Sequence, residues 1–522
     1  MVTLGAYIGD RGCAAALAVD GRVVSAVSDT RGHHARGQRA LPSACVEQIL
    51  GLSGLNACDI TSVVLAEDGP STDDHERAVA LDGKPIIRVA RLHAEAAQLR
   101  GEAGDGIVFA VDGGSDGHAA IFSKSGSTLR CLQAIPGIRD MLQMASAVAA
   151  ALGEDAGEPW SILESCYGNA EESIETAVNA ALWAEGASIH VDEPAVERLL
   201  ADARQRCPAP LEARDSVHVG VQRTRVALAT STLNRIGDVL SNIARDTQTA
   251  TGGDFIGFSG SAFESAALTA RVASRLEAAM FAPVPERIGA ALGAALLPNE
   301  SPATVRHLSL GPAFSDQEIK ADLENCRLDY VYEPDWSKLL TRSSDLLRSG
   351  ATLAWFQGNL EFGERSFGSR SILCDPSSQY ARENVNVFLL HRDVGAPLPV
   401  SIATEAAPST SKRPSSVRFG YLSASCMADR RSQLTSAIDR YGRCLMHVTD
   451  EAATPVLHRL LALHYARTGV PGLINVPLTQ AGCLARTPRD AVREAFGSAI
   501  DVLVVGRFLV SKDYWLLRSR AS

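Results

Sequence analysis

Residues 352–376 read TLAWFQGNLEFGERSFGSRSILCDP, the most informative stretch of this 522-residue chain. The stretch opens with a short apolar run, 353–356, which predicts a buried strand that ends at Gly358. Glycines then alternate with charged and polar side chains before the apolar pair 372–373. Glycine lets a backbone approach a ligand closely, and an arginine fork fits two phosphate or carboxylate oxygens. The pattern therefore indicates either a site for a phosphate-bearing anion or a tight loop whose arginines bridge acidic neighbours.

This stretch resembles the signature of the O-carbamoyltransferases that tailor antibiotics and nodulation factors. The usual form is Trp-Phe-Gln-Gly-Arg-Met-Glu-Phe-Gly-Pro-Arg-Ala-Leu-Gly-Asn-Arg-Ser-Ile-Leu, followed by Asp-Pro. The positions kept here are Trp355, Phe356, Gln357, Gly358, Glu361, Phe362, Gly363, Arg365, Gly368, Arg370, Ser371, Ile372, Leu373, Asp375 and Pro376. The main departures are Asn359, Glu364 and Ser369, where the family has arginine, proline and asparagine. By this resemblance the chain is identified as a member of the family.

The composition is that of an ordinary globular protein, with 46% hydrophobic residues, 21% charged residues and a net charge of -10. The length suits two or more domains of about 100–200 residues each. The mild acidity argues against an extended nucleic-acid surface, and no apolar run approaches the roughly 20 residues of a membrane span. The opening TLGAYIG predicts a strand rather than a signal peptide. The 11 cysteines lack CxxC spacing, so we expect a cytoplasmic protein with reduced thiols.

The first thirty or so residues predict three strands separated by turns. Asp20-Gly21 between two alternating apolar runs is a strong hairpin signal. This opening resembles that of actin-like ATPase domains and of the carbamoyltransferases. The carbamoyltransferases usually carry a His-Asp pair after the first glycines, whereas Asp10 and Arg11 stand at those positions here. The resemblance therefore implies an α/β protein whose first domain has the duplicated actin-like ATPase fold.

The resemblance also implies a divalent-metal site made by two histidines on one helix and two aspartates, a donor set suited to orienting phosphates. His93 matches the second histidine and Asp112 the first aspartate. The other two positions hold Val89 and Arg287, and an arginine cannot ligate a cation. Three alternatives remain open: an incomplete metal site at His93 and Asp112, an ordinary helix histidine at His93, or Arg287 as a counter-charge for phosphate.

Residues 222–249 carry apolar side chains at helical spacing and predict one long helix that ends before Thr251. FIGFSGSAFESAALTARV then predicts a strand, a turn at Gly260 and a helix, and backbone amides at a helix start can hold an anion. The matching family turn is Ala-Gly-Gly-Val-Ala-Leu-Asn. Here Ser259 replaces one glycine and Glu264 the asparagine, and a carboxylate disfavours phosphate. Gly260 is the nucleotide-binding position that remains.

LSLGPAFSDQEI, residues 308–319, matches a connector of the family, so we expect domains at 1–324 and 325–522. The second domain resembles the YrdC-like module, which in the family makes carbamoyl-adenylate. The further matching stretches are 445–450, 464–477, 486–492 and 500–512. Several family polar residues are replaced in this domain, by Leu390, Ala396, Thr449 and Ala453, and of the Asn-Thr-Ser-Phe-Asn run only Asn475 remains. Arg392 is kept.

The resemblance implies that carbamoyl phosphate and ATP give carbamoyl-adenylate in the second domain. The carbamoyl group then passes to a hydroxyl of a natural product bound at the first domain. The cofactor-binding residues that it implies are Arg365, Arg370, Ser371, Arg392 and Gly260. His93 and Asp112 are the residues left for catalysis or for metal or phosphate binding.

The replacements in both domains support an alternative function. Removing one positioned charge commonly costs on the order of a hundredfold in rate, and several losses together leave little of it. The chain would then be a non-catalytic partner subunit or regulator, with an intact family homologue as its protein partner, or would bind ATP with altered chemistry. We expect no nucleic-acid or membrane partner, and a homodimer is one hypothesis for the oligomeric state.

Overall fold

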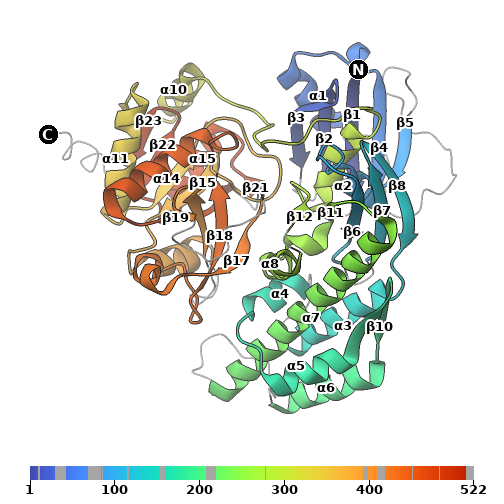
Figure 1. Ribbon diagram of the computed structural model, residues 1–522. Coiled ribbons are helices and arrows are strands. Elements are labelled where there is room, and N and C mark those ends of the chain that lie inside the picture. Colours follow the sequence, from blue (N-terminus) through green and yellow to red (C-terminus); the bar gives the residue numbers. More distant parts are fainter. Residues whose placement is uncertain are drawn as a thin grey trace.

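The computed structural model confirms an α/β protein with two five-stranded sheets and one nine-stranded sheet in its described residues (Figure 1). In Figure 1 the five-stranded sheets share one half of the molecule and the nine-stranded sheet fills the other. No helix in the described part of the chain has the length and apolarity that a bilayer crossing requires. The structure describes residues 1–9, 12–29, 43–68, 84, 86–114, 117–152, 159–206, 219–276, 278–391, 398–407, 418–449, 451–480 and 483–512.

The first sheet has the strand order β3-β2-β1-β4-β5. Its strands are β1 (Val2–Gly9), β2 (Gly12–Val19), β3 (Arg22–Asp29), β4 (Ser62–Glu67) and β5 (Ile86–Ala90). The first three form an antiparallel meander, and β4 then runs parallel to β1 and β5 parallel to β4. The predicted hairpin between β2 and β3 is confirmed, because Asp20 and Gly21 both have positive φ, at 47° and 78°.

The second sheet repeats this arrangement. Its strands are β6 (Gly106–Val111), β7 (Ala119–Ser125), β8 (Thr128–Ala134), β11 (Phe255–Ser259) and β12 (Ala279–Phe281). Again three strands form an antiparallel meander, and β11 runs parallel to β6 and β12 parallel to β11. This shared order, read from the meander as 3-2-1-4-5, is the structural duplication of the actin-like ATPase fold. The carboxyl ends of β1, β4, β6 and β11 lie close together, because Tyr7 contacts Asp68, Arg91 bridges Asp68 and Asp112, and Ser261 contacts Asp112. We call this junction of strand ends the cleft.

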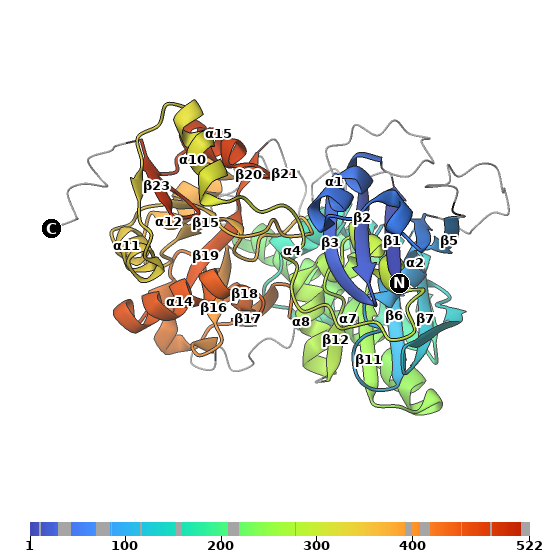
Figure 2. The same cartoon turned by 90° about the horizontal axis from the view of Figure 1, so that it is seen from above.

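Helices lie beside these sheets (Figure 2), and one small hairpin lies among the lower helices in Figure 1. They are α1 (Ser43–Ser53), α2 (Arg91–Ala97), α3 (Ile138–Ala151), α4 (Pro159–Ser165), α5 (Glu172–Ala181), β9 (Leu182–Glu185), β10 (Ser188–Val191), α6 (Glu193–Arg206), α7 (Val219–Thr251), α8 (Ala266–Arg275) and α9 (Ala290–Leu296). The long α7 confirms the predicted helix. Its buried Leu233, Ile236, Leu240 and Ile243 recur every three or four residues and pack in the core beside β6.

Small residues let α9 lie directly on its neighbours. A Cβ at Gly5 of β1 would come within 2.2 Å of the Ala295 nitrogen. A Cβ at Gly293 of α9 would lie 1.6 Å from the Ala94 carbonyl oxygen of α2. Both contacts are to backbone atoms that cannot yield, so these glycines are required for the close approach of α9 to β1 and α2. α9 continues from a short helical turn, Arg287–Gly289, that enters the cleft.

The nine-stranded sheet has the order β13-β23-β22-β14-β15-β19-β16-β18-β17. Its strands are β13 (Val331–Tyr332), β14 (Leu353–Phe356), β15 (Arg370–Cys374), β16 (Pro399–Ala403), β17 (Leu422–Ser425), β18 (Arg443–Thr449), β19 (Gly472–Pro477), β22 (Val502–Val505) and β23 (Phe508–Ser511). The signature stretch forms β14 and β15, which pair antiparallel in the middle of the sheet. The predicted strand at 353–356 is therefore confirmed.

Both faces of this sheet are covered. The elements around it are α10 (Asp316–Asn325), α11 (Trp336–Arg348), α12 (Ala381–Glu383), the π-helical turn Asn384–Leu389, α14 (Pro455–Thr468), the hairpin of β20 (Thr479–Gln480) and β21 (Cys483–Leu484), and α15 (Pro488–Gly497). Leu353 and Trp355 pack against α11 and α14, whereas Ala354 and Phe356 face the core that includes α10 and α15. The β14 side chains thus alternate between two cores.

Helix α10 contains the expected domain boundary at 324/325. That boundary falls at the last residue of α10, although Ile319 and Leu323 of this helix are buried in the core of the nine-stranded sheet. We therefore propose a boundary just before Ser315, which caps α10 by accepting a hydrogen bond from the Glu318 amide. Below, the first domain means the part before Ser315 and the second domain the remainder.

Arg443 of β18 joins the two domains. Its Nη1 donates to the Gly168 carbonyl oxygen at 2.9 Å, and its Nη2 donates to the Tyr167 carbonyl oxygen. The guanidinium lies 4.7 Å from the centre of the Tyr167 ring and 5.3 Å from that of Tyr441. Asp439 holds the other edge at 2.7 Å. Ring stacking and charge-assisted hydrogen bonds together stabilise this contact.

We expect Arg443→Ala to lower the melting temperature by about 3–8 °C, because it removes two hydrogen bonds across the domain contact together with the ring stacking. Differential scanning calorimetry measures the change. Arg440→Ala is the matched control, because Arg440 is exposed and its guanidinium lies 5.9 Å from the Tyr441 ring. Equal melting temperatures for the two variants would show that Arg443 does not hold the domains together.

Candidate functional site

Asp112 lies at the end of β6, in the cleft between the two five-stranded sheets. It is 5% exposed and accepts hydrogen bonds from Arg91 Nη2 at 2.6 Å, Arg287 Nη2 at 3.1 Å and Ser261 Oγ at 2.9 Å. Burial raises the pKa of Asp112, but the two arginines outweigh burial and hold the pKa below its ordinary value. Asp112 is therefore an ionised partner of two guanidinium groups.

Arg91, the first residue of α2, connects further groups to Asp112. It forms ion pairs with Asp68, which follows β4, and with Glu95, one turn along the same helix. Tyr7 Oη of β1 donates to the second oxygen of Asp68 at 3.1 Å. Burial raises the pKa of Glu95 to about 7. Sequence reasoning missed Arg91 and Glu95, although their i,i+4 spacing on a helix is a recognisable ion-pair signal.

His93 lies on the other side of α2 from Arg91, since two residues correspond to about 200° of helical rotation. Its ring stacks on Phe122 of β7 with the ring centres 5.3 Å apart. Burial and the nearby Arg100 lower the pKa of His93, so its ring is neutral. The structure therefore does not bring His93 and Asp112 together.

The metal site implied by the family resemblance does not fit these side chains. Both oxygens of Asp112 already accept hydrogen bonds from guanidinium groups. The His93 ring stacks on Phe122 instead, and its Nε2 is buried without a hydrogen-bond partner among the described residues. No group of three or more His, Cys, Asp or Glu side chains in the described residues could hold a metal ion. Two arginine charges beside one carboxylate repel a cation. The first domain therefore offers an ion cluster in place of a metal site.

Gly260 forms the turn between β11 and the short helix Ser261–Glu264, with a φ of 98°. A Cβ at this position would lie 2.3 Å from the Val111 carbonyl oxygen, so only glycine fits. The turn places Ser261 against Asp112. Gly260 thus positions Ser261 beside Asp112, and a contact between Gly260 and a nucleotide stays a prediction.

Arg365 of the signature stretch reaches into the first domain. Its Nη2 donates to the Glu264 carbonyl oxygen, and its Nε lies 3.4 Å from Glu286 Oε1. Burial lowers the pKa of Arg365, but the charges of Glu286, Glu264 and Glu164 outweigh burial and hold the pKa above its ordinary value. The sequence left two alternatives open for the arginines of this stretch: a site for a phosphate-bearing anion, or a bridge to acidic neighbours. In the structure Arg365 bridges acidic neighbours, and it does so across the contact between the domains.

Glu164 of α4 is half-buried at this contact and accepts a hydrogen bond from the Ala267 amide of α8 at 2.9 Å. Burial raises its pKa from 4.5 to about 7, against the opposing effects of this amide and of Arg365. As the pH rises, the Glu164 carboxyl therefore loses its proton in the unfolded chain before it does so in the folded protein. Glu164 consequently lowers the free energy of unfolding progressively between about pH 4.5 and pH 7.

Glu164→Gln should remove this dependence. The quantity to compare is the free energy of unfolding of the variant minus that of the wild type. We expect this difference to rise by up to about 3 kcal/mol between pH 4.5 and pH 7 and to level off above pH 7. Urea denaturation at a series of pH values measures the difference. A difference that does not change with pH would contradict the raised pKa.

Arg370 differs from Arg365 in being completely buried. Its guanidinium lies 3.5 Å from the centre of the Phe356 ring and donates to the carbonyl oxygens of Gln357, Ser369 and Ala485 at 2.9, 3.0 and 3.1 Å. Burial lowers its pKa to about 10, so it stays charged. We propose that Arg370 orders the signature loop, because its donors are directed to backbone oxygens. Arg392, Ala396 and Asp10 lie outside the described residues.

Ser371 of β15 belongs to a buried polar cluster in the second domain. Its Oγ lies 2.6 Å from Ser366 Oγ. The Ser366 carbonyl oxygen accepts from Tyr421 Oη at 2.9 Å and from Asn475 Nδ2 at 3.4 Å. We call Ser366, Ser371, Ser401, Tyr421, His447 and Asn475 the hydroxyl cluster.

The rest of the hydroxyl cluster comes from the neighbouring strands β16, β18 and β19. Asn475 Nδ2 also donates to Ser401 Oγ at 2.8 Å, and Ser401 Oγ lies 3.2 Å from His447 Nδ1. Ser401 and His447 are register partners on the parallel strands β16 and β18. The Oδ1 atom of Asn475 is buried and has no hydrogen-bond partner among the described residues. An unpaired buried acceptor is costly and marks a position where a ligand donor would fit.

Phe367 closes the hydroxyl cluster. Its ring lies 4.8 Å from the His447 ring and 5.9 Å from the Tyr421 ring, measured between centres. The adjoining cavity, lined also by Glu361 and Thr449, encloses about 10 Å³, roughly one water molecule. A nucleotide therefore fits only after Phe367 moves.

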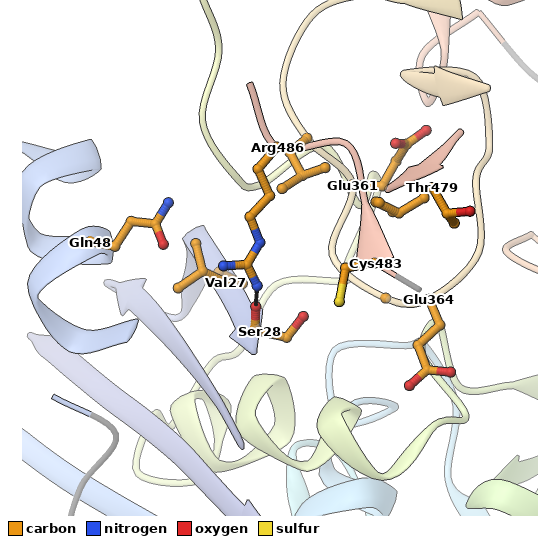
Figure 3. Close-up of a pocket in the computed structure, with 12 residues that line it drawn as sticks. Val27, Ser28, Gln48, Glu361, Glu364, Thr479, Cys483 and Arg486 are labelled. Carbon is orange, nitrogen blue, oxygen red and sulfur yellow. Dashed lines mark hydrogen bonds between the residues drawn. The ribbon is translucent and has the colours of Figure 1, made fainter. Parts of the chain in front are cut away.

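A larger cavity of about 260 Å³ lies between the domains (Figure 3). Ser28 of β3 and Gln48 of α1 line it on one side, and Glu361, Glu364 and Arg486 on the other. Figure 3 shows Arg486 reaching across to donate to the Ser28 carbonyl oxygen, at 2.6 Å. Glu361 lines both this cavity and the small one beside Phe367, so it lies between the domain interface and the hydroxyl cluster.

The family model for the carbamoyltransferase C-terminus matches residues 344–512. The nodulation protein NolO of Bradyrhizobium diazoefficiens is 23% identical over 427 residues, which cover 78% of this chain and 75% of that protein. The 3'-hydroxymethylcephem-O-carbamoyltransferase of Streptomyces clavuligerus is 26% identical over 180 residues, covering 34% of this chain and 33% of that enzyme. These matches support membership of the O-carbamoyltransferase family.

Two further relatives are uncharacterized proteins. MJ1058 of Methanocaldococcus jannaschii and sll1178 of Synechocystis sp. are both 26% identical to this chain, which spans 38% and 42% of their lengths. Among solved structures, full-length HypF in a phosphate- and nucleotide-bound form matches 57% of this chain and 55% of its own at 16% identity, with a TM-score of 0.37. The activator of the 2-hydroxyisocaproyl-CoA dehydratase from Clostridium difficile matches 57% of this chain and 94% of its own at 15% identity, with a TM-score of 0.33.

Proposed function

We propose that this chain makes carbamoyl-adenylate from carbamoyl phosphate and ATP in its second domain and transfers the carbamoyl group to a hydroxyl of a small natural product. Membership of the O-carbamoyltransferase family supports the proposal. The observation that carries it is the unpaired Asn475 Oδ1 among the buried hydroxyls. Specialised metabolism in the cytoplasm is the setting we propose, with the second domain acting as a YrdC-like module.

The hydroxyl cluster complements a carbamoyl group. That group presents an NH2 donor and a carbonyl acceptor on one plane, and Asn475 Oδ1 can accept from the NH2. The Ser371 and Ser401 hydroxyls can donate to the carbonyl oxygen. Burial raises the pKa of Tyr421, so its phenol keeps its proton and continues to hold the Ser366 carbonyl oxygen. Fixed donors in a site without water stabilise developing charge more strongly than donors in solvent.

The proposed activation transfers an adenylyl group. Water first cleaves carbamoyl phosphate into carbamate and inorganic phosphate. An oxygen of the carbamate then attacks the α-phosphorus of ATP, and the bond from that phosphorus to the bridging oxygen breaks, so that pyrophosphate leaves with the electron pair. In the last step the acceptor oxygen attacks the carbamoyl carbon, the hydroxyl proton is released, and AMP leaves with the electron pair of the broken bond. We place the acceptor on the side of the interdomain cavity, because Glu361 separates that cavity from the hydroxyl cluster.

Titration calorimetry of the full-length chain with ATP, followed by carbamoyl phosphate, tests the binding part of the proposal. We expect saturable binding of ATP in the wild type, and loss of the subsequent carbamoyl phosphate binding in Ser371→Ala, which removes the hydroxyl. Ser377→Ala is the control, because the Ser377 hydroxyl donates a hydrogen bond to Asp375 and does not belong to the hydroxyl cluster. The absence of ATP binding to the folded wild type would overturn the proposal.

A second candidate function is that of a non-catalytic subunit or regulator. It is supported by the ion pairs that occupy Asp112 and by Phe367, which fills the space beside the hydroxyl cluster. An intact family homologue encoded in the same genome would be its partner, through an interface of at least about 1,000 Å². Co-expression of the two chains followed by size-exclusion chromatography tests this, and separate elution would count against a stable partnership.

A further inference from the structure

Among the described residues, the cleft of the first domain contains two guanidinium groups and three carboxylates in one continuous ion cluster. Arg91 contacts Asp68, Glu95 and Asp112, and Arg287 contacts Asp112 from the other side. Asp68 follows a strand of the first sheet and Asp112 a strand of the second. The cluster therefore joins the two halves of the duplicated domain at the point where their strands end.

The carboxylate oxygens of the cluster are almost all occupied by hydrogen-bond donors. Arg91 and Tyr7 each take one oxygen of Asp68, and Arg91 and Arg287 take the two oxygens of Asp112. In Glu95, Arg91 donates to Oε1, while Oε2 is enclosed and has no partner among the described residues. A divalent cation binds carboxylate lone pairs, and here it would have to displace guanidinium groups that carry the same sign of charge.

We infer that Arg91 and Arg287 replace a divalent cation in this cleft and that the first domain holds its two halves together without metal. The pair supplies two positive charges beside Asp112, the charge that a divalent ion would bring. Unlike a bound ion, this charge is part of the chain and does not dissociate. This inference rests on the contacts within the ion cluster and is independent of catalysis by the second domain.

Metal binding to the full-length chain, without nucleotide, is the first test. After incubation with Mn²⁺, Zn²⁺ or Mg²⁺ and desalting, we expect no stoichiometric metal in the protein. We also expect its melting temperature to change by less than about 1 °C between millimolar Mn²⁺ and EDTA. One equivalent of metal that disappears in Asp112→Asn would overturn the inference.

Charge-preserving and charge-removing variants of Arg287 give the second test. Arg287→Gln removes the charge at similar size, and we expect its melting temperature to fall by about 5–10 °C, because Asp112 loses one of its two ion pairs. Arg287→Lys keeps the charge, and its melting temperature should fall less than half as far. Equal melting temperatures for the wild type and Arg287→Gln would show that Arg287 does not hold the cleft. Pyrophosphate release by the second domain is a separate readout, so failure of the proposed function would leave this result unchanged.

Discussion

Arg370→Ala is expected to lower the free energy of unfolding by about 3–5 kcal/mol, since it leaves buried carbonyl oxygens unsatisfied and opens a cavity in the core. In the wild type, the guanidinium donates to oxygens of the signature loop and of Ala485. It also lies 3.5 Å from the centre of the Phe356 ring. No neighbouring donor can take over these contacts, because the side chain is fully enclosed.

Urea denaturation followed by fluorescence measures this loss. The buried Trp355 reports on the second domain, because it lies on β14, next to Phe356. Arg370→Lys keeps the charge but lacks the planar fork, so we expect an intermediate loss of stability. Arg348→Ala is the control, because Arg348 is exposed and pairs only loosely with Asp345, at 3.6 Å. A stable Arg370→Ala variant that has lost ATP binding would contradict the structural role and support the phosphate contact implied by the resemblance.

Asn475→Ala is expected to reduce carbamoyl-phosphate-dependent pyrophosphate release by about 100-fold or more, because it removes the acceptor proposed for the carbamoyl NH2 and frees Ser401. A coupled pyrophosphate assay with saturating ATP measures the rate. The loss should appear mainly in the maximal rate, with a smaller change in the ATP concentration for half-maximal rate.

A buried serine elsewhere in the second domain provides the matched control for Asn475. Ser344 is 1% exposed and lies 3.0 Å from His464 Nδ1, away from the hydroxyl cluster. Ser344→Ala should therefore change the stability without a comparable change in the rate. If Ser344→Ala and Asn475→Ala lose the same fraction of activity, the loss reflects packing and not carbamoyl binding.

Short elements of both domains could be predicted from local patterns. The apolar run at 353–356 and the Asp20-Gly21 turn each fix a short element through side-chain chemistry that is visible in the sequence. The duplication of the first domain was not visible as a repeat. It is a property of the strand order, and the two halves share that order without sharing the residues that fill it.

The roles of individual arginines could not be read from the sequence. Arg365 and Arg370 lie in the same signature stretch, yet one crosses to the first domain and the other is enclosed beneath the sheet. Their roles depend on which loops fold over them, and those loops come from distant parts of the chain. The family resemblance points to His93, whereas the helix turns His93 away from Asp112 and brings Arg91 to it.

The hydroxyl cluster shows the same limit. Asn475 stood out as the one remaining residue of its family run, but its partners Ser401 and His447 did not. They meet because β16 and β18 pair in parallel with these two residues in register. A pairing register between strands that are far apart in the chain is set by the whole sheet, and no local signal reports it.

Pyrophosphate release from ATP by the full-length chain tests the account most directly. We expect release to depend on carbamoyl phosphate, to yield AMP in equal amount once an acceptor hydroxyl or water takes the carbamoyl group, and to fall by about 100-fold in Asn475→Ala. No pyrophosphate from well-folded wild-type protein, or release that is unchanged in Asn475→Ala, would contradict the assignment of the hydroxyl cluster as the carbamoyl-adenylate site.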